Sequence, residues 1–228
     1  MSDSYQPIPL PHRRDLSPER MQQEAQAFRA LMAQRHSIRD FAPTSVDQSV
    51  IADCIAAAGL APSGANQQPW HFVAISDPAM KSQIRAAAEA EEEKFYAGGG
   101  GDVWIRALEP IGTGANKPHL EIAPWLIVIF AQRYGVAADG SRVKHYYVPE
   151  SVGIATGVLI TALHHAGLSC LTHTPNPMGF LNAMCQRPES EKPVMILAVG
   201  HPAENATVPA AAKRKKPLDQ ISTFCTKD

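Results

Sequence analysis

The pattern of apolar and polar residues along this chain predicts helices in some stretches and strands in others. Apolar residues recur at helical spacing over residues 46–60, and residues 149–167 are almost wholly apolar, so both stretches are predicted helices. Four short apolar runs, bounded by turn-forming residues, predict strands: WHFVAIS, APWLIVIFAQ, LSCLTHT and PVMILAVGHP. The apolar helix is expected in the core or in an interface between subunits.

Two further helices are predicted from capping signals at their first residues. A Ser-Pro pair at 17–18 and an Asp-Pro pair at 77–78 each combine an N-cap side chain with proline at the first helical position. These signals predict helices that run to about residue 34 and residue 96. A short helix is expected within MGFLNAMCQ, which precedes the last strand.

These elements predict an α+β fold, with a mixed, mostly antiparallel sheet flanked by helices. We expect an N-terminal arm over residues 1–16 and a single domain over 17–228. Within that domain the glycine-rich stretch 97–120 predicts a mobile active-site lid with a turn or two of helix. Residues 202–228 are expected to form a C-terminal extension.

Composition narrows the function classes. The 228 residues carry a net charge of about −1, and no long basic run suggests a nucleic-acid partner. The four cysteines are scattered, without the spacing of a zinc site, and fit a reducing compartment. No signal-peptide pattern and no apolar stretch of about 18 residues is visible, so a cytoplasmic protein without a membrane partner is expected.

Three short motifs have the chemistry of a binding site. The first, RHSIR, offers two arginines and a serine to a phosphate, although a charged helix end is the simpler explanation of this motif taken alone. The second, PSGANQQPW, combines small residues with three amides and suits close approach of a heterocycle. The third, LTHTPNP, places two hydroxyls around a histidine at a strand end. An ordinary loop and an ordinary turn are the alternatives for these two.

The octapeptide EAEEEKFY, residues 89–96, contains four carboxylates and one lysine. Like charges three and four residues apart on a helix repel each other, so the cluster is either a solvated face or an anion site that receives a cation. We assign Glu89, Glu91 and Glu93 to the solvated face. Glu92 and Tyr96, four residues apart, share another face of the helix.

The order of the motifs resembles that of the FMN-dependent nitroreductase superfamily: RHSIRDFAP, then GLAPSGANQQPWHFV, then APWLIVIF, then GHPAE. Longer strings, among them AENATVP and KPLDQI, are similar to the iodotyrosine deiodinase branch. The resemblance implies a nitroreductase-like α+β fold and an intertwined homodimer that binds FMN at its interface. It also implies electron transfer from reduced flavin to a halotyrosine, with release of halide.

The resemblance also implies roles for individual residues. In the FMN site, Thr174 would place its hydroxyl at flavin N5 as the catalytic group. The other residues implied to bind FMN are Arg35, His36, Ser37, Arg39, Ser63, Gly64, Thr172, His173 and Lys215. In the substrate site, the backbone N–H of Ala65 would meet the phenolate oxygen. Glu92, Tyr96 and Lys117 would clamp the ammonium and carboxylate groups, so that the cation awaited by Glu92 would arrive with the ligand.

Alternative functions remain open at this point. A general FMN nitroreductase or quinone reductase using NAD(P)H would have a more open, apolar site and would not need the Glu/Tyr/Lys trio. A flavin-consuming branch of the superfamily has no use for a zwitterion clamp. A binding module without catalysis would hold flavin or an amino acid and fail to reoxidise with halotyrosine.

Overall fold

The computed structural model describes residues 5–226, whose contacts divide the chain into two compact units, Met1–Arg35 and His36–Asp228. The first unit contains α1 (Pro18–Ala33). Ser17 caps this helix, because its Oγ accepts the Arg20 N–H at 3.2 Å. The helix predicted from the Ser-Pro signal is therefore confirmed, whereas the division into an arm over 1–16 and a domain over 17–228 stays a prediction.

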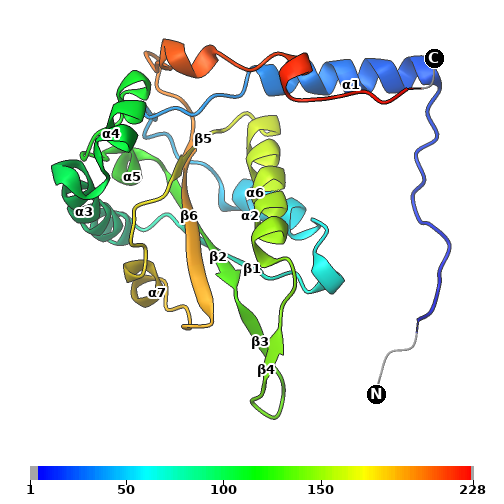
Figure 1. Cartoon of the computed structure of the whole chain (residues 1–228), viewed down its shortest axis with the longest axis horizontal. Coiled ribbons are helices and arrows are strands. Elements are labelled where there is room, and N and C mark those ends of the chain that lie inside the picture. Colours follow the sequence, from blue (N-terminus) through cyan, green and yellow to red (C-terminus); the bar gives the residue numbers. More distant parts are fainter. Residues whose placement is uncertain (1–4, 227–228) are drawn as a thin grey trace. The chain divides into compact units, whose positions relative to one another are not determined.

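The second unit is built on a four-stranded sheet (Figure 1). Its strands, in spatial order, are β1 (Trp70–Ile75), β2 (Trp125–Gln132), β6 (Glu191–Gly200) and β5 (Ser169–His173), and each neighbouring pair is antiparallel. An isolated parallel bridge joins Ser37 to Cys170 at the β5 edge. All four predicted strands are confirmed, as is the mixed, mostly antiparallel sheet.

Helices cover both faces of this sheet. One face carries α3 (Pro78–Lys94), α5 (His119–Ile122) and α7 (Phe180–Met184), and the other carries α2 (Gln48–Gly59) and α6 (Val148–His165) (Figure 1). Side chains of β2 alternate between the two cores, because successive residues of a strand point to opposite faces. The almost wholly apolar helix predicted over residues 149–167 is α6, and its residues Val152, Leu159 and Leu163 lie in the core between α2, α6 and the sheet.

The predicted lid is largely helical. After Lys94 the chain makes a π-helical turn, η2 (Phe95–Gly99), and then forms α4 (Asp102–Leu108) and the 3-10 turn η3 (Glu109–Ile111). Gly98 and Gly101 have φ of 123° and 72°, which residues with a Cβ rarely adopt. These two glycines therefore let the chain change direction between α3 and α4.

The sequence pattern missed a hairpin of two three-residue strands, β3 (Tyr134–Val136) and β4 (Arg142–Lys144). Both strands are exposed or half-buried, so no alternation of apolar residues marks them. Short 3-10 turns were also missed: η1 (Gly64–Asn66), η4 (Ala210–Lys213) and η5 (Leu218–Gln220). Across residues 5–226 no helix is long and apolar enough to cross a membrane.

Candidate active site

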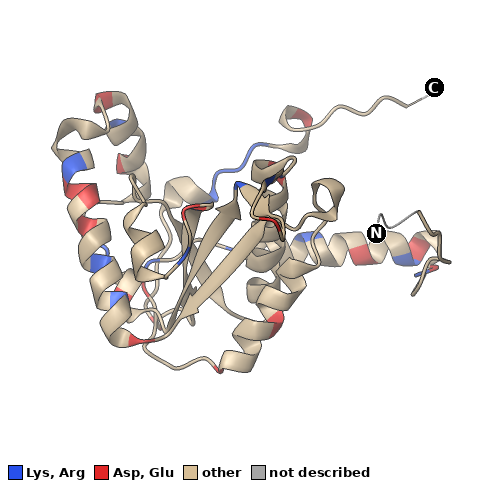
Figure 2. Ribbon diagram, turned by 90° about the horizontal axis from the view of Figure 1, so that it is seen from below, with Lys and Arg blue, Asp and Glu red and all other residues tan. Residues whose placement is uncertain are grey.

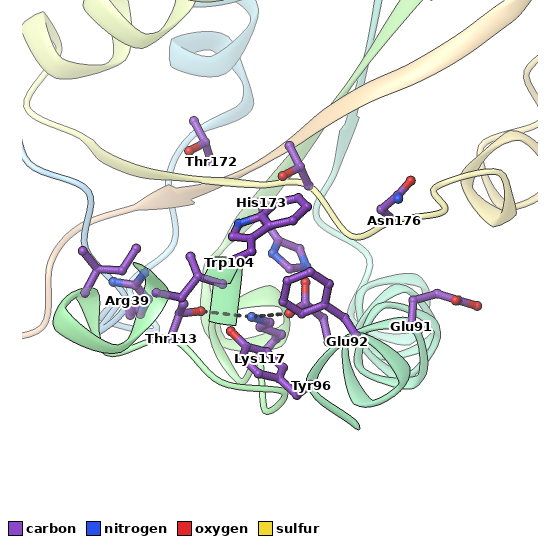
Figure 3. A pocket seen from close by; sticks show the side chains of 14 residues that line it. Arg39, Glu91, Glu92, Tyr96, Trp104, Thr113, Lys117, Thr172, His173 and Asn176 are labelled. Carbon is purple, nitrogen blue, oxygen red and sulfur yellow. Dashed lines mark hydrogen bonds and ion pairs between the residues drawn. The ribbon is translucent and has the colours of Figure 1, made fainter. Parts of the chain in front are cut away.

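A cavity of about 200 Å³ opens between the lid, the end of α3, the segment before α5 and the end of β5 (Figure 3). We call it the lid pocket. It brings together seven of the residues predicted for a site: Arg39, Glu92, Tyr96, Lys117, Thr172, His173 and Thr174. The rest of its lining is Glu91, Phe95, Trp104, Leu108, Ile111, Thr113 and Asn176.

Glu92 and Lys117 form an ion pair on the inner side of the lid pocket. Lys117 Nζ lies 2.9 Å from Glu92 Oε2, and the two side chains are only 5% and 14% exposed. Lys117 Nζ also donates to Thr113 Oγ1 at 3.2 Å and lies 5.8 Å from the centre of the Tyr96 ring. The expectation that the chain supplies no cation to Glu92 is therefore wrong, because a lysine 25 positions away provides it.

Glu89 does not face the solvent as predicted. Its Oε1 accepts the Lys117 backbone N–H at 2.6 Å and the Arg85 Nε–H at 2.9 Å. Burial opposes ionisation, but these two donors outweigh it and hold the pKa of Glu89 below its usual range. Arg85 in turn donates to Glu121 at 2.9 Å. Glu89 thus anchors the backbone that presents Lys117. Acidic and basic residues both lie along α3 (Figure 2).

The end of β5 presents alternate side chains to two environments. Thr172 and Thr174 are exposed, whereas His173 between them is buried. The bridge from Ser37 to Cys170 brings the segment from His36 to Arg39 alongside this strand. Among the described residues no carboxylate forms an ion pair with Arg39, so its guanidinium is available to an anion.

His119 was missed as a site residue. It opens α5 two positions after Lys117 and lies edge to face against His173, with ring centres 5.9 Å apart. Burial, followed by the charge of Lys117, lowers the pKa of His119 to about 4 and that of His173 to about 3. Both imidazoles are therefore neutral at pH 7. Only the proximity of His119 to Lys117 in the sequence could have signalled its place.

The predicted loop residues Ser63, Gly64 and Ala65 do not line the lid pocket. They lie beside the start of α6, where the Gly64 N–H donates to Ser151 Oγ at 3.3 Å. A Cβ on Gly64 would approach the Tyr146 carbonyl oxygen to 2.6 Å, so only glycine fits. Ala65 has φ of 50°, a strained conformation for a residue with a side chain.

Further contacts hold this loop. Asn66 and Gln68 also have positive φ, and Gln67 donates from Nε2 to the Lys144 carbonyl at 2.9 Å. Gln67 Oε1 accepts the Tyr146 N–H at 2.8 Å. None of the hydrogen bonds described for residues 5–226 uses the Ala65 N–H, and Ala65 is exposed, so this donor is available to a ligand or to solvent.

The predicted residues His36, Ser37 and Lys215 of the second unit do not line the lid pocket. His36 and Ser37 are half-buried. Lys215 is exposed, between η4 and η5. Arg35 is the last residue of the N-terminal unit, so its role in binding FMN stays a prediction, as does that of Lys215.

The lid adds an aromatic wall that the motifs did not identify. Phe95 packs edge to face on Tyr96 and on Trp104, with ring centres 5.2 and 5.0 Å apart. Trp104 is 58% exposed although it lines the pocket. Its large apolar side chain, isolated in a glycine-rich stretch, was the signal available in the sequence.

Comparison with known proteins places these residues in context. A sequence model of the Nitroreductase family matches residues 32–201. The iodotyrosine deiodinase of Haliscomenobacter hydrossis is 47% identical over 199 residues, which cover 87% of this chain and 90% of the relative. The iodotyrosine deiodinase 1 of Mus musculus is 42% identical over 220 residues, which cover 96% and 76%.

Solved structures agree with the sequence comparisons. A crystal structure of oxidised iodotyrosine deiodinase, bound to FMN and 3-iodo-L-tyrosine, superposes with a TM-score of 0.72. The two chains are 27% identical, and the match covers 86% of this chain and all of the other. A BluB-like flavoprotein from Clostridium difficile, at 21% identity and a TM-score of 0.65, shares the fold.

Proposed function

Since this chain belongs to the nitroreductase family and, within it, to the iodotyrosine deiodinases, we propose that it is an FMN-dependent reductive dehalogenase of halotyrosines. The observation that carries the proposal is the buried Glu92–Lys117 pair with Tyr96 beside it. The ammonium group of a zwitterion can replace Lys117 as the partner of Glu92. Its carboxylate can replace Glu92 as the partner of Lys117. The general nitroreductase alternative has no need of two buried charges, which are expensive to desolvate.

The residues at the end of β5 fit FMN. Arg39 supplies a guanidinium without a carboxylate partner, which suits a phosphate. Thr172 and Thr174 present exposed hydroxyls on one side of the strand, where they would hydrogen-bond the flavin ring and its side chain. Bound FMN, once reduced, supplies the two electrons that the reaction needs.

The protein's part in the reaction is to bind, orient and exclude water. The carbon–halogen bond breaks, a carbon–hydrogen bond forms from one proton and two electrons, and halide leaves. Glu92 would take the ammonium group, and Lys117 and Tyr96 the carboxylate, so that the phenol ring lies toward Thr172 and Thr174. The aromatic wall of Phe95 and Trp104 would keep water from the ring.

We further propose that the enzyme is a homodimer. The loop at Ser63–Ala65 carries an unused N–H but does not line the lid pocket of its own chain. An apolar groove of about 690 Å³ runs along α6 and is lined by Val148, Val152, Ile160, Val194 and Met195. A second copy on this groove would bury exposed apolar surface and could bring its own loop to the pocket. Light scattering coupled to size-exclusion chromatography tests this stoichiometry.

The decisive experiment for activity is anaerobic. The purified holoenzyme is reduced with dithionite, 3-iodo-L-tyrosine is added, and iodide release is measured together with the flavin spectrum. We expect one iodide per flavin and return of the oxidised spectrum. Reduced enzyme that neither releases iodide nor reoxidises would refute the proposal.

A matched variant connects this activity to the clamp. Glu92→Gln removes one charge with little change in size, so halotyrosine turnover should fall at least tenfold. Reduction of a nitroaromatic compound, which needs no zwitterion clamp, should change less than twofold. Equal loss on both substrates would indicate damage to the flavin site rather than to the clamp.

A further inference from the structure

Buried polar atoms without a hydrogen-bond partner are concentrated at one place in the molecule. Within residues 5–226 there are three such side-chain atoms: Tyr96 Oη, His119 Nε2 and His173 Nε2. All three lie near Lys117, because Tyr96 and His173 line the lid pocket with it, and His119 follows it by two positions and packs against His173. Native proteins leave few buried polar atoms unpaired, so this grouping indicates groups that await a ligand.

His173 is the imidazole that reaches the lid pocket. It follows Leu171 by two positions on β5, so its side chain points to the face of the sheet that α3 and α5 cover. Figure 3 shows it on the side of the strand that faces Lys117. Its side chain is 7% exposed, and its orientation is therefore set by packing.

His119 lies behind His173 and does not line the pocket. It is 3% exposed, and its ring plane is turned 82° from that of His173. Edge-to-face packing of this kind is favourable and directional. His119 is thus the ring that packs directly against His173.

The charges around the two imidazoles favour an anionic ligand atom. Besides burial, the positive charges of Lys117 and Arg39 lower the pKa of His173. The same two charges and that of Arg85 on α3 lower the pKa of His119 in addition to burial, and the negative charge of Glu89 opposes them. A neutral imidazole adds a hydrogen-bond donor beside these cations without adding charge. An anionic oxygen near Lys117 would find a donor in the tautomer that carries its proton on Nε2.

We propose that His173 donates from Nε2 to the carboxylate of the amino-acid ligand, next to Lys117, and that His119 is the positioning residue for His173. This inference rests on the proposed function and adds to it a group selective for the carboxylate. It predicts discrimination between an amino acid and its decarboxylated amine that exceeds the contribution of Lys117 alone.

Binding to the oxidised holoenzyme tests the proposal, with titration calorimetry as the readout. The ligands are 3-iodo-L-tyrosine, 3-iodotyramine, which lacks the carboxylate, and 2-iodophenol, which lacks both charged groups. The variants are His173→Leu, which removes the donor, and His173→Gln, which restores one. His71→Leu is the matched control, because His71 is a partly buried histidine of β1 outside the lid pocket.

His173→Leu should raise the Kd of 3-iodo-L-tyrosine about tenfold or more, as expected for loss of a hydrogen bond to a charged group. The Kd of 3-iodotyramine and of 2-iodophenol should change less than about twofold, and His173→Gln should recover most of the loss. Equal weakening of all three ligands, or no change for iodotyrosine, would overturn the assignment. Failure of the wild type to bind iodotyrosine would instead overturn the proposed function.

Two His119 variants separate positioning from simple packing. His119→Phe preserves the edge-to-face contact and should retain the preference for iodotyrosine over iodotyramine. His119→Ala frees the His173 ring and should reduce that preference by about threefold. If both variants keep the full preference, His119 does not position His173.

Discussion

The two faces of the central sheet are filled by similar apolar side chains but treat buried polar groups differently. Under α2 and α6, the Thr156 hydroxyl donates to the Val152 carbonyl at 2.7 Å and Ser151 Oγ accepts the Gly64 N–H. Under α3 and α5 lie a buried lysine in an ion pair and two histidines with unpaired Nε2 atoms. Unpaired groups reduce stability, so the polar groups under α2 and α6 stabilise the fold, whereas those under α3 and α5 fit the proposed binding of a ligand.

The largest effect is expected where a buried charge loses its partner. Lys117→Met leaves Glu92 buried without a cation, and breaking such a pair costs about 3–5 kcal/mol. The free energy of unfolding from urea denaturation at pH 7 should fall by this amount. The double variant Lys117→Met/Glu92→Gln removes both charges and should recover much of the loss. If the double variant is as unstable as the single one, the pair is not the cause.

A purely apolar deletion on the opposite face should come next. Leu159 of α6 is fully buried, and Leu159→Ala leaves a cavity that costs about 2–5 kcal/mol. Urea denaturation at fixed protein concentration measures it, with Leu60→Ala, at a position 87% exposed, as the control. Iodotyrosine binding by the folded variant should be unchanged. A specific loss of binding would show that the two faces are not separate in function.

The parts of this structure that were predictable are local. The caps at Ser17 and Asp77 and the apolar runs of β1, β2, β5 and β6 depend on neighbouring residues only. The predicted clamp also met in one pocket, since Glu92 and Tyr96 share a helix face. Resemblance to a family, rather than periodicity, supplied Lys117.

The parts that were not predictable depend on contacts between distant segments. Glu89 lies in a strongly acidic stretch, which is typical of a solvated helix face. Only the return of the chain at Lys117 gives Glu89 a backbone partner. His119 and His173 meet because α5 packs against the end of β5. The β3–β4 hairpin has no buried face. Its sequence therefore lacks the alternation of apolar residues from which a strand is predicted.

Acid should affect chiefly the face that carries His119 and His173, although burial also lowers the pKa of His71 on β1. The pKa of His119 and of His173 in the folded protein, about 4 and about 3, lies below the value of 6.5 for a free histidine. The unfolded chain therefore binds more protons, and stability that is complete above pH 6.5 is lost as the pH falls toward those values. Each histidine contributes about 1.4 kcal/mol per pH unit in this window.

Urea denaturation at half-unit steps from pH 7 to pH 5 measures this slope. The pKa of Glu89 is also lowered, but from 4.5, so its own loss of stability lies below this range. His119→Leu should reduce the slope by the contribution of one histidine, about 1.4 kcal/mol per pH unit. An unchanged slope would mean that the imidazole pair is not the group that titrates.

The smallest effect is expected from a polar group that already has its partner. Thr156→Val in α6 removes one hydrogen bond to the Val152 carbonyl, and a valine of similar shape occupies the buried site. The Val152 carbonyl lies inside the helix, where it keeps its backbone donor, so no buried polar atom is left unpaired. The free energy of unfolding should change by less than about 1 kcal/mol, without a pH-dependent component between pH 7 and pH 5. A loss as large as that of Lys117→Met would remove the distinction between the two faces, because it would show that polar groups under α6 are as critical as those around the lid pocket.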